Sequence, residues 1–348
     1  MMHIENGCLI RYFGFETEVE IPKEVRTIKT KAFENSLELK KVMIHDQVKE
    51  IESGAFFKCE NLKDIQLPNG ITTIHEHTFA FCTSLKNIII PDSVETIGIS
   101  AFANCEKLEQ IIMGSNVKTI KANAFEYCMN LDHMIIPSSV TSLDFSAFNL
   151  CTNLNTLIIP THIARSLIKN KKRLNQFTYT TKNIFVFHQD FLKDVKSLHD
   201  LNMYATLYRY PLASNSDHPI KTYLYFMNKD DFDITNAEQV SLTIQNDCIV
   251  VNHTLNRYFG KEIRYTIDEK ITEIDAYAFK NNKILQQVIC PTKLKTIGFG
   301  AFENCRYLNT IVFNDQLEKI DQWAFALCNY LNNYTINNHV QVHPYAFA

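Results

Sequence analysis

The sequence contains few of the residues that usually form isolated turns. Glycine and proline number 9 each in 348 residues, about 5% of the chain against roughly 12% in an average protein. This scarcity favours turns that are set by a repeating structure over isolated glycine turns. Hydrophobic residues make up 46% of the chain and charged residues 21%, which excludes a disordered protein.

An excess of one charge and long apolar runs are also missing. Lys and Arg number 35 against 38 Asp and Glu, so the charge indicates neither a nucleic-acid partner nor an anionic membrane. No window approaches the roughly 18 apolar residues of a membrane span. The start, Met1 to Gly7, lacks the basic and apolar regions of a secretory signal. We therefore expect no nucleic-acid binding, no membrane insertion and a cytoplasmic location by default, with surface or secreted export requiring a non-standard route.

Cysteine, by contrast, is frequent and regularly spaced. The chain has 10 cysteines, and five of them recur every 23 residues, at Cys59, Cys82, Cys105, Cys128 and Cys151. Phenylalanine keeps the same period, at Phe33, Phe56, Phe79, Phe102, Phe125 and Phe148. A period of 20 to 50 residues is typical of a solenoid, in which one unit is too thin to bury its own apolar face.

The repeat returns near the end of the chain, out of phase with the first run. Ala278-Phe279, Ala301-Phe302 and Ala324-Phe325 are again 23 residues apart, with Cys305 and Cys328 on the cysteine column. We predict three domains: a first array with a hairpin cap over residues 1–160, a non-repeat connecting segment over 161–240, and a second array with its own cap over 241–348.

A similar lead-in precedes each array and predicts the two caps. Asn6-Gly7 lies between apolar residues, which is a strong hairpin signal, and Asn246-Asp247 is a weaker version of it. The sequence Arg-Tyr-Phe-Gly then follows at 11–14 and again at 257–260. Each hairpin is predicted to cover the first open edge of its solenoid.

The residues between the columns predict the local structure of one repeat. Leu62-x-x-Ile65-x-Leu67 predicts a short strand with Ile65 and Leu67 facing inward. The segment Ala-Phe-x-x-Cys is predicted to form one helical turn with Phe and Cys on one side. We therefore predict an α/β repeat solenoid, a leucine-rich repeat fold whose short parallel strands form a concave sheet and whose convex side carries short helical or irregular turns.

Residues 161–240 depart from the repeat and predict an α+β segment that interrupts it. Apolar spacing predicts helices over Thr161–Leu174 and Asp190–Tyr204. Apolar runs predict strands over Ile184–Phe187 and Thr222–Met227. The segment is too apolar for a flexible linker.

The consensus V-x-x-I-x-x-x-A-F-x-x-C-x-x-L-x-x-I-x-I-P resembles the BspA-like leucine-rich repeat family. The resemblance covers about residues 15–160 and 262–348, and the hairpin lead-ins look like the N-terminal caps of that family. It implies a surface or secreted protein that adheres to host proteins or cells. It implies no catalytic residues.

The cysteine column has a chemical and a structural interpretation. Metal binding or disulfides would make it functional, but the sequence contains no C-x-x-C and no zinc spacing of Cys and His. Buried free thiols that act as small hydrophobic residues are the favoured interpretation. We predict no cofactor and no metal site. The cysteine and phenylalanine columns are then both part of the core. The sole tryptophan, Trp323, is expected to be partly exposed on the side away from the sheet.

The candidate binding residues lie at the strand positions that point away from the core. Period two places Met43, Gln66, Ile89, Ile112, Ile135 and Ile158 in one outward column. A polar column, Lys41, Asp64, Asn87, Gln110, His133 and Thr156, runs beside it. The predicted protein-binding set is Met43, Gln66, Asn87, Ile89, Gln110, Ile112, His133, Ile135, Thr156 and Ile158. The apolar column also has two structural explanations, which are strand propensity and cover by the connecting segment.

These observations predict a non-catalytic protein-binding repeat protein, adhesin-like or host-interacting, with a protein partner on the concave face. The alternative is a structural or assembly module whose outward column is buried internally or in self-association. A remote alternative is a metal-dependent hydrolase. Its candidate residues are His188, Asp190, His199, Asp200, Asp217 and His218.

Overall fold

A computed structural model describes residues 1–169, 183–187, 203–211, 223–227 and 237–348. The chain divides into two compact units. The first unit comprises Met1–Ser197 and Tyr210–Asn236, and the second comprises Leu198–Arg209 and Ala237–Ala348. The three domains predicted from the sequence, with boundaries at residues 160 and 240, stay a prediction.

Each array begins with the predicted antiparallel hairpin. In the first unit β1 (Met2–Glu5) pairs with β2 (Cys8–Tyr12). In the second, β19 (Glu238–Gln245) pairs with β20 (Cys248–Val251). The turn residues have positive φ in both hairpins, 49° and 74° at Asn6 and Gly7 and 49° and 57° at Asn246 and Asp247. Asn, Asp and Gly tolerate this region best, which explains the two hairpin signals in the sequence.

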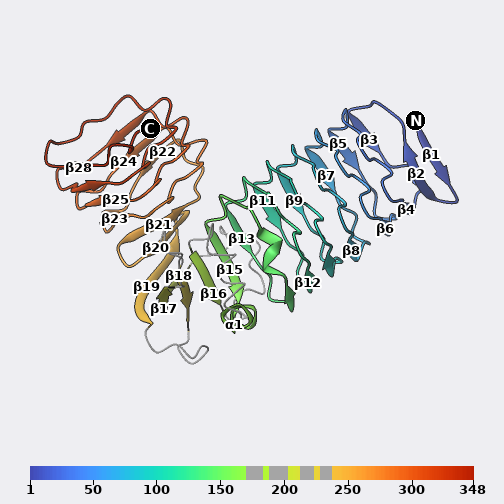
Figure 1. The fold of residues 1–348 in the computed structure, drawn as a ribbon, viewed down its shortest axis with the longest axis horizontal. Helices are drawn as coiled ribbons and strands as arrows, with labels where there is room; N and C mark the ends of the chain where they lie inside the picture. The colour runs from blue at the N-terminus through green and yellow to red at the C-terminus, as the bar shows by residue number, and fades with distance from the viewer. Residues whose placement is uncertain (170–182, 188–202, 212–222, 228–236) are drawn as a thin grey trace. The chain divides into compact units, whose positions relative to one another are not determined.

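Each turn of the first array then contributes two short parallel strands, one on each side (Figure 1). The strands of three or more residues, which from the second onward follow the Leu of the repeat, are β3 (Glu18–Glu20), β5 (Lys41–Met43), β7 (Asp64–Gln66), β9 (Asn87–Ile89), β11 (Gln110–Ile112), β13 (His133–Ile135) and β15 (Thr156–Pro160). The two-residue strands are β4 (Thr27–Ile28), β6 (Glu50–Ile51), β8 (Thr73–Ile74), β10 (Thr96–Ile97), β12 (Thr119–Ile120) and β14 (Ser142–Leu143). Paired residues are 23 apart, as Ile88 and Ile111 are. The repeat period therefore fixes the register.

The first unit continues beyond the repeat. A nine-residue helix, α1 (Thr161–Lys169), follows β15, and β16 (Asn183–Phe187) and β18 (Tyr223–Phe226) extend the sheet of β15 in parallel. The predicted strand over 184–187 is thereby confirmed, and the one predicted over 222–227 is confirmed from Tyr223 to Phe226. The predicted helix over Thr161–Leu174 is confirmed as far as Lys169, and its last residues lie outside the described part.

The second unit repeats the architecture of the first. Its first strands are β17 (Met203–Pro211), which belongs to this unit as far as Arg209, β19, β20 and β21 (Thr254–Tyr258). They pair in antiparallel order. Its three-residue strands are β22 (Arg264–Thr266), β24 (Gln287–Ile289) and β26 (Thr310–Val312). Its two-residue strands are β23 (Glu273–Ile274), β25 (Thr296–Ile297), β27 (Lys319–Ile320) and β28 (Gln341–Val342). Met203 and Tyr204 belong to β17, so the helix predicted over Asp190–Tyr204 is wrong at its last two residues, and the remainder lies outside the described part.

The predicted helical turns are wrong, and the fold is a repeat β-solenoid with almost no helix. Within the described residues, the sole Ala-Phe segment with helical geometry is a 3-10 turn, η1 (Phe145–Phe148). In the other Ala-Phe segments as far as Ala324-Phe325, the residue before Ala-Phe and the second residue after it have positive φ, for example 52° at Ser100 and 60° at Asn104. Their N–H groups donate to carbonyls of the next turn, Ala122 at 3.1 Å and Glu126 at 2.7 Å. Because these hydrogen bonds run between turns, no i to i−4 helical ladder forms.

The phenylalanine column forms a continuous stack in each unit. Neighbouring rings from Phe33 to Phe148 lie 4.9 to 5.8 Å apart and within 14° of parallel. In the second unit the stack runs from Phe279 to Phe347 with spacings of 4.5 to 5.0 Å. Tyr12 and Tyr258, from the repeated Arg-Tyr-Phe-Gly lead-ins, form the first ring of each stack at 5.0 and 5.1 Å. The lead-in motif therefore continues the core into each cap.

The cysteine column consists of free thiols inside the turns. Cys59, Cys82, Cys105, Cys128 and Cys151 are fully buried. Each thiol donates a hydrogen bond to the carbonyl of the Phe one turn earlier, over 3.0 to 3.3 Å. A cysteine thus fills space like a small apolar residue and also supplies a donor. Burial raises the pKa of Cys59, Cys105 and Cys151 to about 12.

Brief alkylation of the folded protein is expected to modify Cys8 and spare the column of the first array. Cys8 is partly exposed, whereas the column thiols from Cys59 to Cys151 are fully buried and stay protonated near pH 8, and the thiolate is the reactive form. Iodoacetamide treatment at pH 8, followed by mass spectrometry of the peptides, measures this. The same treatment in denaturing urea, where all 10 cysteines react, is the control. Rapid labelling of Cys105 in the folded protein would show that the reagent reaches the column thiols, which would contradict their burial.

Candidate functional site

The candidate site is one face of the three-residue strands in the first unit, here called the strand face. Each strand presents its first and third residues outward while its central residue is core, as Ile88 is between Asn87 and Ile89. Parallel pairing aligns equivalent positions, so Ile89 lies beside Ile112 and Asn87 beside Gln110. The predicted alignment of these residues into two outward columns is therefore confirmed.

The N-terminal half of the strand face is open to solvent. Ile89 is 64% exposed and Met43 is 40% exposed. Gln66 and Asn87 are exposed, and Gln110 and Ile112 are half-buried. These side chains contribute little to the core, so the repeat itself does not require isoleucine or methionine at their positions.

The C-terminal half of the strand face is closed, and the predicted exposure is wrong there. Ile135 is 7% exposed, and Thr156 and Ile158 are fully buried, while His133 is half-buried. The sheet does not end at β15: Ile158 pairs with Phe185 of β16, and Phe185 pairs with Tyr225 of β18. These two rings stack at 4.7 Å and are also buried. The closed region of this face therefore continues onto β16 and β18, where the repeat no longer applies.

The polar column gives the open half a mixed charge. Lys41 and Asp64 form an ion pair with 3.5 Å between Nζ and a carboxylate oxygen. Both side chains are substantially exposed, so the pair is worth at most about 1 kcal/mol. Farther along, Asp132 contacts the His133 ring. The open face is thus an apolar column flanked by paired charges and by the amides of Asn87 and Gln110.

The described residues assemble no metal centre. No group of three or more His, Cys, Asp or Glu side chains among them could hold a metal ion. The six His and Asp residues of the hydrolase alternative, between 188 and 218, lie outside the described part. In that described part, no helix is both long and apolar enough to cross a membrane.

The family of the chain follows from a comparison with family models. The BspA-type leucine-rich repeat region matches in six copies, over residues 4–132, 72–199 and 259–348. The chain belongs to this family. The resemblance inferred from the Ala-Phe-x-x-Cys consensus is thereby confirmed, and the matches cover both arrays of this BspA-type protein. No curated protein matches it.

Crystal structures of bacterial leucine-rich repeat proteins are similar to this BspA-type chain. A leucine-rich repeat protein of T. pallidum is 33% identical, with 43% of this chain and 72% of that chain covered and a TM-score of 0.42. The pneumococcal vaccine antigen PcpA is 19% identical over 92% of this chain and 66% of its own, with a TM-score of 0.38. A leucine-rich cell surface protein of Faecalibacterium prausnitzii is 18% identical over 97% and 93%, with a TM-score of 0.37.

A second group of exposed side chains in this BspA-type protein was not predicted. Tyr307 and Tyr330 are 54% and 62% exposed. With Gln286, Asn309 and Asn332 they line a surface pocket of about 250 Å³ at the starts of the strands of the second unit. The signal that could have found them is a column comparison, because no turn of the first array has an aromatic residue at the position of Tyr307 and Tyr330.

Proposed function

We propose that the chain is a non-catalytic protein-binding protein that contacts its partner through the open half of the strand face. The observation that carries this proposal is the apolar column of Met43, Ile89 and Ile112, in which Met43 and Ile89 are exposed and Ile112 is half-buried. A partner that buries one isoleucine fully gains about 1.5–3 kcal/mol. The partner that we propose is a host or cell-surface protein in an adhesin-like interaction, as the family resemblance implies.

The flanking polar groups suit a protein partner. Interfaces of proteins combine an apolar centre with a polar rim that fixes register and orientation. Here the rim would comprise Lys41, Asp64, Asn87 and Gln110. Asn87 and Gln110 each offer amide donors and an acceptor to a partner backbone.

The alternative of a structural role is favoured for the other half of the same face. Ile135, Thr156 and Ile158 are buried within the chain, as the internal-cover explanation requires. We therefore leave these three residues, and His133 beside them, out of the proposed contact surface. The binding set narrows to Met43, Gln66, Asn87, Ile89, Gln110 and Ile112.

A Met43→Asp/Ile89→Asp double variant tests the proposal. Two charges in the apolar column are expected to reduce recovery of a true partner at least about tenfold, since desolvating a carboxylate removes the gain from apolar burial. The measurement is quantitative mass spectrometry of proteins captured from host-cell surface extracts by wild type and variant. The proposal that the strand face is the binding site is supported if the recovery of a protein falls with the double variant and not with the control variant.

The matched control is Ile99→Asp. Ile99 is 40% exposed, as Met43 is, but it lies in a turn of the same array away from the strand face. The control is expected to recover partners as wild type does. Equal recovery by the wild type and the double variant would refute the strand face as the site, and equal losses in both variants would indicate a non-specific effect of added charge.

A further inference from the structure

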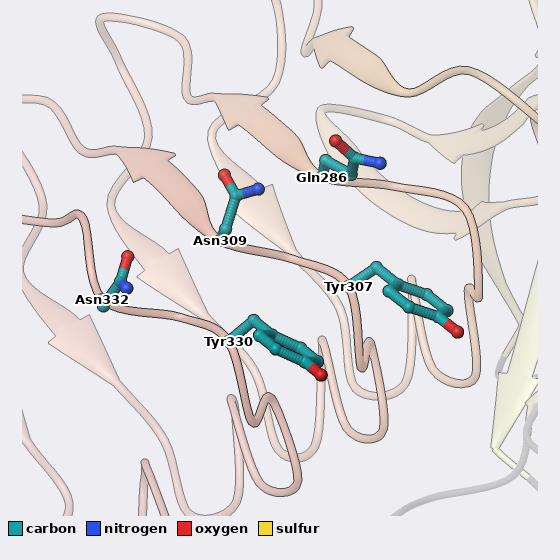
Figure 2. Close-up of a pocket in the computed structure, with 5 residues that line it drawn as sticks. All are labelled: Gln286, Tyr307, Asn309, Tyr330 and Asn332. Carbon is teal, nitrogen blue, oxygen red and sulfur yellow. The ribbon is translucent and has the colours of Figure 1, made fainter.

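The surface pocket of the second unit combines two aromatic rings with three side-chain amides in a regular array. Figure 2 shows Gln286, Asn309 and Asn332 in one row at the strand starts, with Tyr307 and Tyr330 in a second row beside it. The two rings are parallel within 6°, with 6.3 Å between their centroids. We call these five residues the tyrosine–amide edge.

The repeat does not require these residue types. In the first array the position of Tyr307 and Tyr330 is held by Glu38, Asn61, Ser84, Lys107, Asn130 and Asn153. Asn61 and Asn153 there donate from Nδ2 to a backbone carbonyl of the preceding turn, Leu37 at 2.8 Å in the first case and Met129 in the second. A tyrosine cannot reproduce that amide hydrogen bond, and both tyrosines stand in solvent instead. Their presence therefore has no explanation in the packing of the turns.

The neighbouring amide row also departs from the first array. Its equivalent positions there are occupied mostly by charged residues, namely Lys40, Lys63, Lys86, Glu109, Asp132 and Asn155. In the second unit all three are neutral amides. Within the described residues, the side-chain amides of Gln286 and Asn332 make no hydrogen bond, while Oδ1 of Asn309 accepts from Thr310 Oγ1 at 2.8 Å. The row is thus neutral and largely free to bind a ligand.

We propose that the tyrosine–amide edge binds a neutral oligosaccharide. A sugar ring presents C–H groups on its faces and hydroxyl groups around its rim. The C–H groups pack on an aromatic ring, and a side-chain amide, which both donates and accepts, can bridge two neighbouring hydroxyls. Three successive turns about 4.8 Å apart give the row a length of about 10 Å, which exceeds a single sugar ring. This site is independent of the strand face of the first unit.

The lack of charge and the type of polar group decide the class of ligand. The five lining residues carry no charge. An acidic glycan would therefore gain no ion pair with the lining. A proline-rich peptide can dock on aromatic rings, but proline lacks an N–H donor and would use only the donor half of each amide. A polyhydroxylated ligand uses both halves.

Affinity electrophoresis of the full chain tests the proposal. The probes are gels that contain one neutral polysaccharide: laminarin, hydroxyethylcellulose, galactomannan or dextran. Gels with heparin and with poly-L-proline test the two alternative ligand classes, acidic glycans and proline-rich peptides. At least one neutral polysaccharide is expected to retard the protein. Tyr307→Ala and Tyr330→Ala are expected to weaken that interaction about tenfold or more, whereas Tyr307→Phe, which keeps the ring, stays within about twofold.

The controls separate a binding defect from a folding defect. Lys107→Ala changes the equivalent position of the first array and is expected to leave the retardation unchanged. The emission of Trp323, which lies in the second unit, reports whether the variants remain folded there. The proposal is overturned if no neutral polysaccharide retards the protein, if folded alanine variants bind as well as wild type, or if only heparin or poly-L-proline gives a tyrosine-dependent shift.

Discussion

A Phe102→Ala variant is expected to lose about 3–5 kcal/mol of unfolding free energy. Phe102 is fully buried and stacks between Phe79 at 5.3 Å and Phe125 at 5.5 Å. Truncation removes both ring contacts and leaves a cavity that rigidly hydrogen-bonded turns cannot fill. Because each turn of a solenoid is stabilised by its neighbours, the loss weakens two interfaces at once. Urea titration followed by circular dichroism measures the change.

An exposed residue of the same turn provides the control for this variant. Ile99→Ala removes a similar apolar side chain at a position that is 40% exposed, so a change within about 0.5 kcal/mol is expected. Phe302→Ala is the equivalent change in the second unit, where Phe302 lies 4.5 Å from Phe279 and 5.0 Å from Phe325. It should lower the urea midpoint reported by Trp323 fluorescence. An unchanged midpoint in both phenylalanine variants would contradict a stabilising role for the stacks.

The repeat and its caps could be predicted because they depend on local spacing. The 23-residue period determines which residues pair between turns, and Asn6-Gly7 marks a hairpin because few other residues tolerate positive φ at both positions. The burial of Phe102 and Cys105 follows from the same columns. These features need only short-range sequence information, and the structure confirms them.

The turn geometry could not be predicted because the same spacing is compatible with a helix. Ala, Phe and Cys at positions i, i+1 and i+4 suit one side of a helical turn. The structure instead places left-handed residues on either side of Ala-Phe, and only some of them are Gly or Asn. Lys31 and Trp323 have φ of 58° and 57°, in a region where bulky side chains are disfavoured. Hydrogen bonds from their N–H groups to the next turn, 3.2 Å to Ser53 and 2.9 Å to Tyr345, hold them there.

The candidate site could be predicted only in part, because strand periodicity shows which residues share a face but not whether that face is exposed. Period two correctly identifies the residues that share the strand face, including Ile89 and Ile158. It contains no information about what lies over that face. Ile158 is buried where the sheet continues into β16 and β18, whose residues follow no repeat, so no column relates them to the first array. The tyrosine–amide edge departs from the repeat consensus, so a pattern of recurring residues does not indicate it.

The protein is expected to lose stability steeply above pH 9, because its buried thiols ionise only in the unfolded chain. Burial raises the pKa of Cys59, Cys105, Cys151, Cys248, Cys290 and Cys328 from 9.0 to about 12. It also raises the pKa of Cys82, Cys128 and Cys305 well above 9.0. Below pH 9 both states hold these protons, so the thiols add no pH dependence. Between pH 9 and pH 12 the folded state binds more protons, and each thiol lowers stability by about 1.4 kcal/mol per pH unit.

A Cys105→Ala variant isolates the contribution of one thiol to this slope. Urea titrations at pH 8, 9, 10 and 10.5 give the unfolding free energy at each pH. The variant is expected to be less stable than wild type at pH 8, since it loses the Sγ donor to the Phe79 carbonyl, 3.2 Å away. Its slope above pH 9 should be smaller by about 1.4 kcal/mol per pH unit. Tyr12, whose pKa burial raises to about 12, steepens the decline of both proteins equally above pH 10. Parallel curves for variant and wild type would show that Cys105 is not held protonated by the fold.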